Sequence, residues 1–138
     1  MGRIQGNANG FQPALDLRSG VPVYRQIIDQ VLAGIASGTL AAGDQLPTVR
    51  QLAVDLTINP NTVLRAYREL EIGGTLETHQ GTGTFISNKK VVKNNAERER
   101  QLAQLAGELA ARAGAAGFTV EEVVERLNEL MPPSRQRR

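Results

Sequence analysis

The stretch NPNTVLRAYREL at residues 59–70 decides the fold of the first part of the chain. Proline breaks a helix when it lies inside one, but it is favoured at the first helical position, directly after an N-cap asparagine. Asn59 and Pro60 stand in this order, so we expect the proline to begin a helix rather than to interrupt one. The helix is predicted to continue to about Ile72, where two glycines follow and end it.

A second, shorter helix is predicted immediately before this one. Thr48 stands three residues before Gln51, which is the spacing of a capping box. Apolar residues then recur at helical intervals as far as Leu56. About three residues separate the two helices, and two short helices joined by such a turn form the helix-turn-helix pattern.

A longer helix and a hairpin flank this pair. Pro22 suits a first helical turn, and Gly38 suits a helix end. Between them an apolar face recurs at helical spacing, formed by Tyr24, Ile27, Ile28, Val31, Leu32 and Ile35. On the other side, the short β-capable runs LET and FIS surround the glycine-rich HQGTGT. The sequence therefore predicts a winged helix-turn-helix domain that is mainly α with a small β-hairpin, in which Leu40 and Leu46 fill the core from the connecting loop.

The last part of the chain differs in composition and predicts a second unit. Residues 89–96 are polar and basic, as in a linker, and two helical segments with aliphatic stripes follow. The stripe residues that we expect to dimerise are Leu102, Leu105, Leu109, Val120, Val123, Val124, Leu127 and Leu130. Two short helices cannot bury both stripes by themselves, so they need a partner. The winged domain is one possible partner, and a second copy of the chain is the simpler one.

These segments give a predicted domain plan. It comprises a flexible N-terminus (1–14), the winged domain (15–88), the linker (89–96) and a two-helix dimerisation domain (97–138) that ends in a basic tail.

Composition argues against several classes of function. The 138 residues include no cysteine and a single histidine, so a disulfide scaffold, thiolate chemistry and a His/Cys metal site are not expected. No apolar run approaches the length of a membrane span, and the N-terminus lacks a signal-peptide pattern, so the sequence predicts a cytoplasmic protein. A net charge of +2 permits a nucleic-acid partner without requiring one. We found no catalytic constellation, and we expect neither a cofactor nor an enzyme.

The third helix carries the predicted DNA-binding face. At about 100° per residue, Val63, Ala66, Tyr67 and Leu70 fall on one side, and Asn61, Arg65 and Arg68 fall on the other, flanked by Thr62 and Leu64. Arginine can bind guanine, asparagine can bind adenine, and threonine or leucine can contact a thymine methyl group. The alternative is that these side chains are simply solvated. Recognition helices present their N-terminal residues to the bases, which favours the DNA-binding interpretation.

Other candidate contacts lie on the second helix and on the wing. Arg50 opposes the helix dipole, so it either pairs with Asp44 or Asp55 or reaches a phosphate or base. Thr48 lies beside free N–H groups that suit a phosphate. At the wing beside Gln80, Gly81 and Gly83 allow close approach of the backbone to a groove, although glycine-rich tips are usually ordinary turns. His79 could contact a phosphate, but a lone histidine is more often an ordinary surface residue.

The segments LDLRSGVPVYRQI and GDQLPTVRQLAVDLTINPNTVLRAYRELEIGGTLETHQGTGTFIS resemble the DNA-binding domain of GntR-family bacterial transcription regulators. The resemblance covers roughly residues 15–87. The short remainder and the NPNTV form are similar to the YtrA subfamily, whose short C-terminal part is a two-helix dimerisation unit. The resemblance implies a homodimeric repressor that binds a palindromic operator in double-stranded DNA, regulates its own expression and controls, in many cases, an ABC-transporter operon.

The resemblance also implies DNA contacts at Arg50, Asn61, Thr62, Gln80 and Gly81. Many relatives have an arginine where this chain has Pro60, so base preference is expected to shift toward Asn61, Arg65 and DNA shape. Gln80 is neutral where some relatives have a basic residue, so we expect a weaker attraction between the wing and the DNA phosphates. The alternatives are a non-specific architectural DNA-binding protein and a protein-interaction module that has lost DNA binding. The sequence does not identify an effector.

Overall fold

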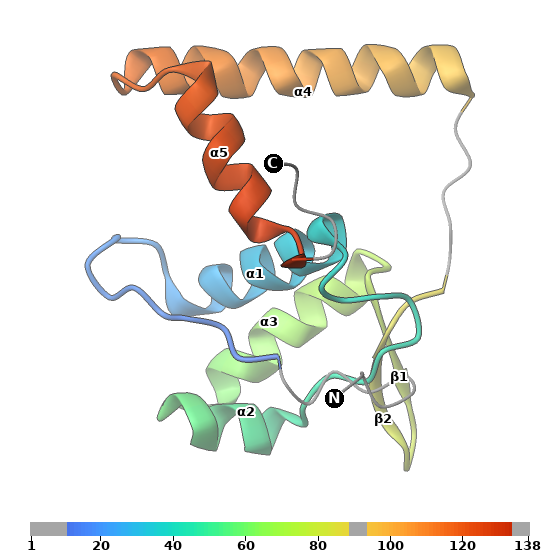
Figure 1. Cartoon of the computed structure of the whole chain (residues 1–138). Helices are drawn as coiled ribbons and strands as arrows, with labels where there is room; N and C mark the ends of the chain where they lie inside the picture. The colour runs from blue at the N-terminus through green and yellow to red at the C-terminus, as the bar shows by residue number, and fades with distance from the viewer. Residues whose placement is uncertain (1–10, 89–93, 134–138) are drawn as a thin grey trace. The chain divides into compact units, whose positions relative to one another are not determined.

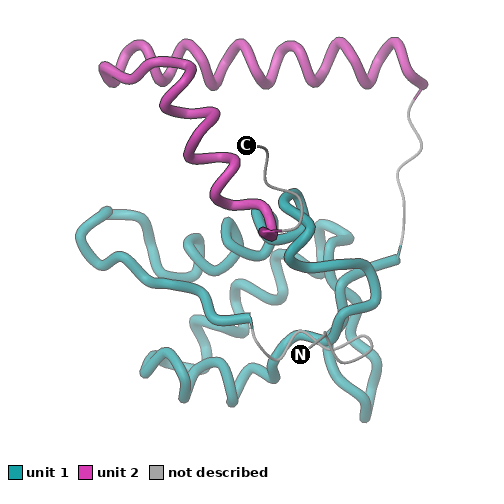
Figure 2. The backbone as a smooth tube through the Cα atoms, in the orientation of Figure 1, with its two compact units in different colours: residues 1–89 teal, residues 90–138 magenta. Residues whose placement is uncertain are grey.

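The structure is a computed structural model, and it describes residues 11–88 and 94–133. The chain divides into two compact units, residues 1–89 and residues 90–138, which Figure 2 shows in two colours. The first unit contains α1 (Val23–Ser37), α2 (Val49–Leu56), α3 (Pro60–Ile72), β1 (Leu76–His79) and β2 (Gly83–Ile86), and the second contains α4 (Asn95–Ala115) and α5 (Val120–Leu130) (Figure 1). The predicted fold class, mainly α with a small hairpin, is confirmed.

Helix α1 has the predicted ends. It begins after Pro22, and Gly38 ends it in the left-handed conformation with φ +86°. The predicted apolar face is correct except at its edge, because Leu32 is 41% exposed and the polar Gln26 is buried instead. The Gln26 side chain accepts a hydrogen bond from the Asp16 N–H and donates to the carbonyls of Asp16 and Val21. It therefore fastens the chain before α1 onto the helix.

The same chain segment is held at a second point. The Gln30 side chain accepts from the Ala14 N–H and donates to the Ala14 carbonyl, both at 2.8 Å. Phe11 and Leu15 pack against the core, so the segment from Phe11 onward belongs to the first unit. The flexible N-terminus predicted for 1–14 otherwise falls on residues 1–10, which lie outside the described residues.

The helix-turn-helix forms because both of its helices carry side-chain caps. Thr48 Oγ1 accepts from the Gln51 N–H at 3.1 Å, and Asn59 Oδ1 accepts from the Asn61 N–H at 2.8 Å. Pro60 is the first residue of α3, and Gly73 caps its end, as predicted. The turn itself is tight because Thr57 adopts the left-handed conformation, with φ 56° and ψ 50°.

Thr57 is the only residue other than glycine with a positive φ among the described residues, which makes it a target for stabilisation. A β-branched side chain is strained in this conformation, whereas asparagine tolerates it. We expect Thr57→Asn to raise the free energy of unfolding by about 0.5–1 kcal/mol. Chemical denaturation of both proteins measures this difference. A destabilised variant would show that the threonine side chain makes contacts that outweigh its backbone strain.

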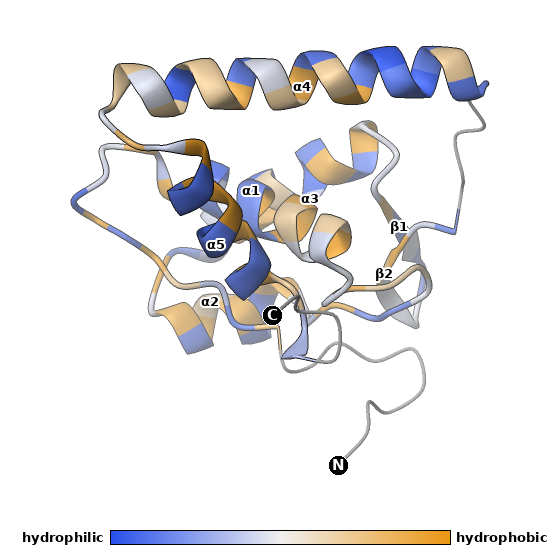
Figure 3. Ribbon diagram, turned by 45° about the horizontal axis from the view of Figure 1, so that its top comes forward, coloured by the Kyte–Doolittle hydropathy of each residue, from blue (hydrophilic) through white to orange (hydrophobic). Residues whose placement is uncertain are grey.

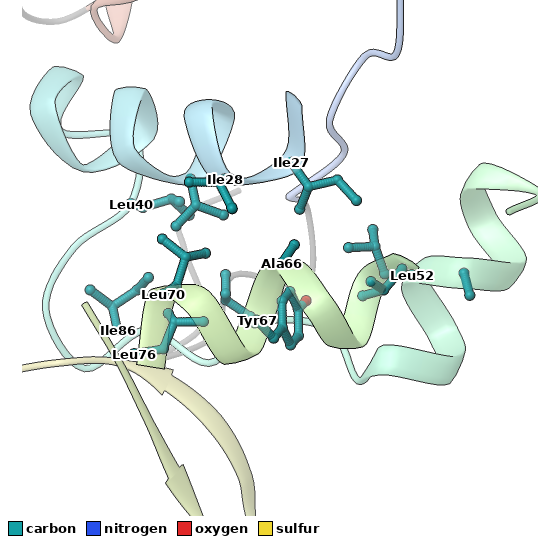
Figure 4. Close-up of a cluster of buried hydrophobic side chains, with 13 residues drawn as sticks. Ile27, Ile28, Leu40, Leu52, Ala66, Tyr67, Leu70, Leu76 and Ile86 are labelled. Carbon is teal, nitrogen blue, oxygen red and sulfur yellow. The ribbon is translucent and has the colours of Figure 1, made fainter. Parts of the chain in front are cut away.

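The core of the first unit lies where α1 and α2 pack against α3 (Figures 1 and 4). Its most buried large side chains are Ile27, Val31, Leu46, Leu52 and Val63. The loop between α1 and α2 inserts Leu40 and Leu46 into this core, as predicted. Leu40 fits against α1 because Gly34 faces it, and a Cβ at Gly34 would lie only 2.8 Å from Leu40 Cδ1.

Tyr67 joins α3 to the start of the helix-turn-helix. Its buried hydroxyl donates to the Pro47 carbonyl at 2.8 Å, just before the cap of α2. Burial raises the pKa of the Tyr67 hydroxyl above its ordinary value, because the phenolate would be poorly solvated there. The unfolded chain therefore loses this proton at lower pH than the folded one, and the resulting stability is present below about pH 10 and is lost as pH rises further.

We expect Tyr67→Phe to lower the free energy of unfolding by about 1 kcal/mol at pH 7, because the Pro47 carbonyl loses its donor. Denaturation at pH 7 and above pH 10 tests both effects. The difference between wild type and variant should shrink at the higher pH, since only the wild type has this proton to lose. A difference that is constant or grows with pH would contradict the proposed role of the hydroxyl.

The wing is a regular antiparallel hairpin. Leu76 pairs with Ile86, and both are buried, so they attach the base of the hairpin to the core. The strands extend further than the predicted runs LET and FIS, because His79 pairs with Gly83 and only three residues remain in the turn. An isolated bridge between Gln45 and Phe85 adds the loop before α2 to the edge of β2, which the sequence did not predict.

The second unit consists of two capped helices. Asn94 Oδ1 accepts from the Glu97 N–H, and Thr119 Oγ1 accepts from the Glu122 N–H. Helix α4 begins at Asn95, inside the predicted linker of 89–96, and residues 89–93 of that linker lie outside the described residues. The predicted basic tail at 134–138 lies outside them as well. Figure 3 shows apolar and polar residues on both helices.

Candidate nucleic-acid interface

Helix α3 has one buried and one exposed face. Val63, Ala66, Tyr67 and Leu70 are buried against α1, α2 and the hairpin. Asn61, Arg65 and Arg68 are exposed on the opposite side, and Thr62 and Leu64 are half-buried between the two faces. The predicted division of this helix is confirmed. That its exposed residues bind DNA stays a prediction at this point.

Two residues of the exposed face, Asn61 and Arg68, have side-chain groups that no other described residue binds. No hydrogen bond or ion pair to another described residue occupies the Asn61 amide or the Arg68 guanidinium. Asn61 lies in the first turn of α3, where its backbone N–H is already bound by Asn59. Its side chain therefore lies at a capped helix start, with a donor and an acceptor that no other described residue binds, which suits recognition of a base edge.

Arg65 is exposed but engaged. Its guanidinium carbon lies 3.7 Å from the centre of the Tyr24 ring on α1, and its Nε lies 3.7 Å from Glu69 Oε1. The sequence placed Arg65 on the correct face but missed both partners. The Glu69 pair could have been found, because an acid and an arginine four residues apart on a helix are neighbours. The Tyr24 contact depends on how α1 packs against α3.

Arg50 lies exposed on α2, and one sequence interpretation of it is wrong. Among residues 11–88 and 94–133 it forms no ion pair, so it pairs with neither Asp44 nor Asp55. Asp44 is instead buried, where it accepts from the Ala41 N–H at 2.9 Å. The other interpretation, that Arg50 contacts a phosphate or a base, stays a prediction. Thr48 is exposed beside it with its oxygen bound to the Gln51 N–H.

The two glycines of the wing, Gly81 and Gly83, differ in their surroundings. Gln80 and Gly81 are exposed at the tip, and a Cβ at Gly81 would meet nothing within 4 Å. At Gly83, where φ is +133°, a Cβ would lie 2.4 Å from Gln45 Nε2. That nitrogen donates to the Thr82 carbonyl at 2.9 Å, so Gln45 holds the turn in place. Gly83 thus has an intramolecular role that the sequence did not reveal.

We expect Gly83→Ala to destabilise the protein by about 1 kcal/mol, because the methyl group meets Gln45 and the backbone φ is unfavourable for alanine. Thermal unfolding measures the loss. Gly81→Ala is the control, since it also changes a positive-φ glycine but adds its methyl group to open space. Equal destabilisation of the two variants would show that the Gln45 contact is unimportant.

His79 packs within the wing. Its ring contacts Phe85 edge-on, with the centroids 5.2 Å apart, and its Nε2 lies 3.6 Å from Glu77 Oε2. Among the described residues, no group of three His, Asp or Glu side chains is arranged to hold a metal ion. None of the described helices is long and apolar enough to cross a membrane.

Three helices, a capped helix-turn-helix and a two-stranded wing define a winged helix-turn-helix protein. Residues 23–86 match the bacterial regulatory proteins of the gntR family. The chain is also 37% identical over 116 residues to the HTH-type transcriptional repressor YtrA of Bacillus subtilis (strain 168), covering 84% of this chain and 89% of that protein. The chain therefore belongs to the GntR family.

Solved structures support the same placement. A transcriptional regulator from Oenococcus oeni is 37% identical to this chain, with a TM-score of 0.54. The match covers 87% of this chain and 98% of the regulator. YtrA from Sulfolobus acidocaldarius, a GntR-family transcription factor, is 35% identical to this chain, with a TM-score of 0.53. That match covers 70% of this chain and 99% of YtrA. The predicted resemblance to YtrA-type GntR regulators is confirmed. The protein is a transcription regulator with a DNA-binding winged-helix domain, and it is not an enzyme.

Proposed function

We propose that this regulator is a homodimeric repressor that binds a palindromic operator. Each winged domain places α3 in a major groove and its hairpin in or beside the adjacent minor groove. Two-fold symmetry of the dimer then matches two half-sites, separated by about one helical turn, or roughly 10 base pairs. Repression is supported by the similarity to YtrA of Bacillus subtilis, which is named a transcriptional repressor.

The observation that carries the proposal is the free polar face of α3. Asn61 and Arg68 project from it with their side-chain groups unoccupied by other described residues, and Arg65 lies between them along the helix. Thr62 borders the same face, and Arg50 and Thr48 at the start of α2 supply further groups for the DNA backbone. Gln80, Gly81 and Gly83 form the wing contact in this proposal.

The apolar residues of the second unit support the dimer. Seven of the eight predicted interface residues are exposed by 40–63% of their surface, and Val123 is half-buried. Among the described residues of α4 and α5, only Ala113 is buried. Exposed aliphatic side chains in this number mark a surface that binds another protein surface. A second copy of the same two helices supplies a surface of matching character.

The remaining parts of the proposal rest on the family. A DNA-binding bacterial regulator acts in the cytoplasm, associated with the nucleoid while it is bound. The similarity to YtrA-type regulators supports regulation of its own expression and an ABC-transporter operon as the target. No cofactor is needed for this activity, and the described residues do not indicate an effector.

Selection of bound fragments from genomic DNA by the purified protein tests the proposal. We expect one enriched motif with two-fold symmetry, upstream of the regulated genes, and an affinity at least about 10³-fold higher than for random duplex. Enrichment without a motif would indicate an architectural DNA-binding protein. Absence of salt-dependent binding to any duplex would indicate a protein-interaction module.

A further inference from the structure

We propose that Tyr24 is a positioning residue for DNA recognition, because its ring holds the Arg65 guanidinium in one orientation at the edge of the α3 face. This inference rests on the proposed DNA-binding function. It adds a residue of α1, outside the helix-turn-helix and the wing, to those that determine sequence preference.

The contacts of Arg65 leave the right atoms free. The Arg65 guanidinium carbon lies over the Tyr24 ring, 3.7 Å from its centre. Glu69 lies 3.7 Å from Nε. Neither contact uses the two terminal amino groups, and these are the donors that form a bidentate pair with guanine. The side chain is still 60% exposed, so those groups can reach a ligand.

The core supports the Tyr24 ring. Tyr24 is half-buried and packs against the core, next to the fully buried Ile27 on the same helix. A ring held by the core is a rigid platform, whereas a solvated ring would move with the arginine. An exposed arginine has many rotamers, and restricting them before binding reduces the entropy lost when DNA is bound. Tyr24 therefore acts through Arg65, not by contacting the DNA.

Arg68 is the internal comparison for this effect. It lies on the same face of α3, is exposed, and has no hydrogen bond, ion pair or ring contact with another described residue. Its guanidinium should sample many orientations in the free protein. The proposal therefore predicts that the two arginines differ in order before any DNA is present.

Two variants of Tyr24 separate the ring from the hydroxyl. Tyr24→Phe retains the ring, and Tyr24→Leu removes it while remaining apolar. With the selected operator and a single-base series of mismatched duplexes, we expect Tyr24→Phe to bind as wild type. Tyr24→Leu should lose about three- to tenfold in affinity and discriminate less at the base pair read by Arg65. In an Arg65→Ala background, Tyr24→Leu should have no further effect on binding.

An additive effect of Tyr24→Leu in the Arg65→Ala background would overturn the proposal, and so would an equal loss in Tyr24→Phe, which would indicate a direct hydroxyl contact. Nuclear magnetic resonance relaxation of the arginine side-chain Nε–H groups in the wild-type protein gives a test that needs no variant. Arg65 should be more ordered than Arg68, and equal mobility would overturn the proposal too. If wild type binds no duplex at all, the proposed function fails, whereas the relaxation difference still reports on the stacking.

Discussion

Leu127→Glu is expected to convert the protein from dimer to monomer. Leu127 lies on the apolar stripe of α5, where 45% of its surface is exposed in the single chain. In the proposed dimer this position is covered, and an unpaired carboxylate buried there costs several kcal/mol. The dissociation constant of the dimer should rise by at least about 10³-fold, since each 1.4 kcal/mol is a factor of ten. Sedimentation equilibrium measures this constant directly.

Ala111→Glu is the matched control for this experiment. Ala111 is exposed on α4, on the side of the helix opposite the leucine stripe, and the substitution adds the same charge. This variant should remain dimeric with unchanged helix content. If Leu127→Glu remained dimeric as well, the interface would lie outside the stripe. The monomer should also bind the operator more weakly, because the two half-sites are no longer linked.

Arg65→Ala is expected to reduce affinity for the selected operator by about 1–3 kcal/mol and to relax preference at one base-pair position. The reason is that a bidentate arginine contact contributes to both affinity and discrimination. Competition binding against duplexes that differ at single positions measures both effects. Unchanged affinity would show that Arg65 reads no base.

A phosphate contact would give a different result at the same position. It would weaken binding to all duplexes alike and reduce the salt dependence, without a change in preference. Arg100→Ala is a suitable control, since Arg100 is an exposed arginine of α4 in the second unit, where its guanidinium pairs with Glu97. It should leave base preference unchanged.

The local features of the fold could be predicted from the sequence. Asn59 and Pro60 determine where α3 begins, and Gly73 determines where it ends, because caps depend on residues within one helical turn. The same holds for Thr48 and Thr119. The exposed face of α3 followed from helical periodicity alone, since the apolar residues mark the opposite side.

The missed contacts of Tyr24 with Arg65 and of Gln45 with Gly83 join residues far apart in the chain, whereas the missed Arg65–Glu69 pair is local. Tyr24 meets Arg65, and Gln45 fills the space beside Gly83, because separate elements pack together. The burial of Gln26 was not expected, because glutamine is a polar residue. Its side chain is buried because it forms hydrogen bonds with the Asp16 backbone, which the sequence does not reveal. The predicted hairpin turn was too long, because glycine and histidine are weak strand formers. In the structure His79 and Gly83 nevertheless pair with each other as strand residues.

The central claim is that the outward face of α3 contacts the duplex. Titration of labelled protein with the selected operator, followed by nuclear magnetic resonance, tests it most directly. We predict that the side-chain signals of Asn61, Arg65 and Arg68 shift most, and that a scrambled duplex produces smaller changes at the same residues. Shifts confined to other surfaces, with these three side chains unaffected at saturation, would contradict the account.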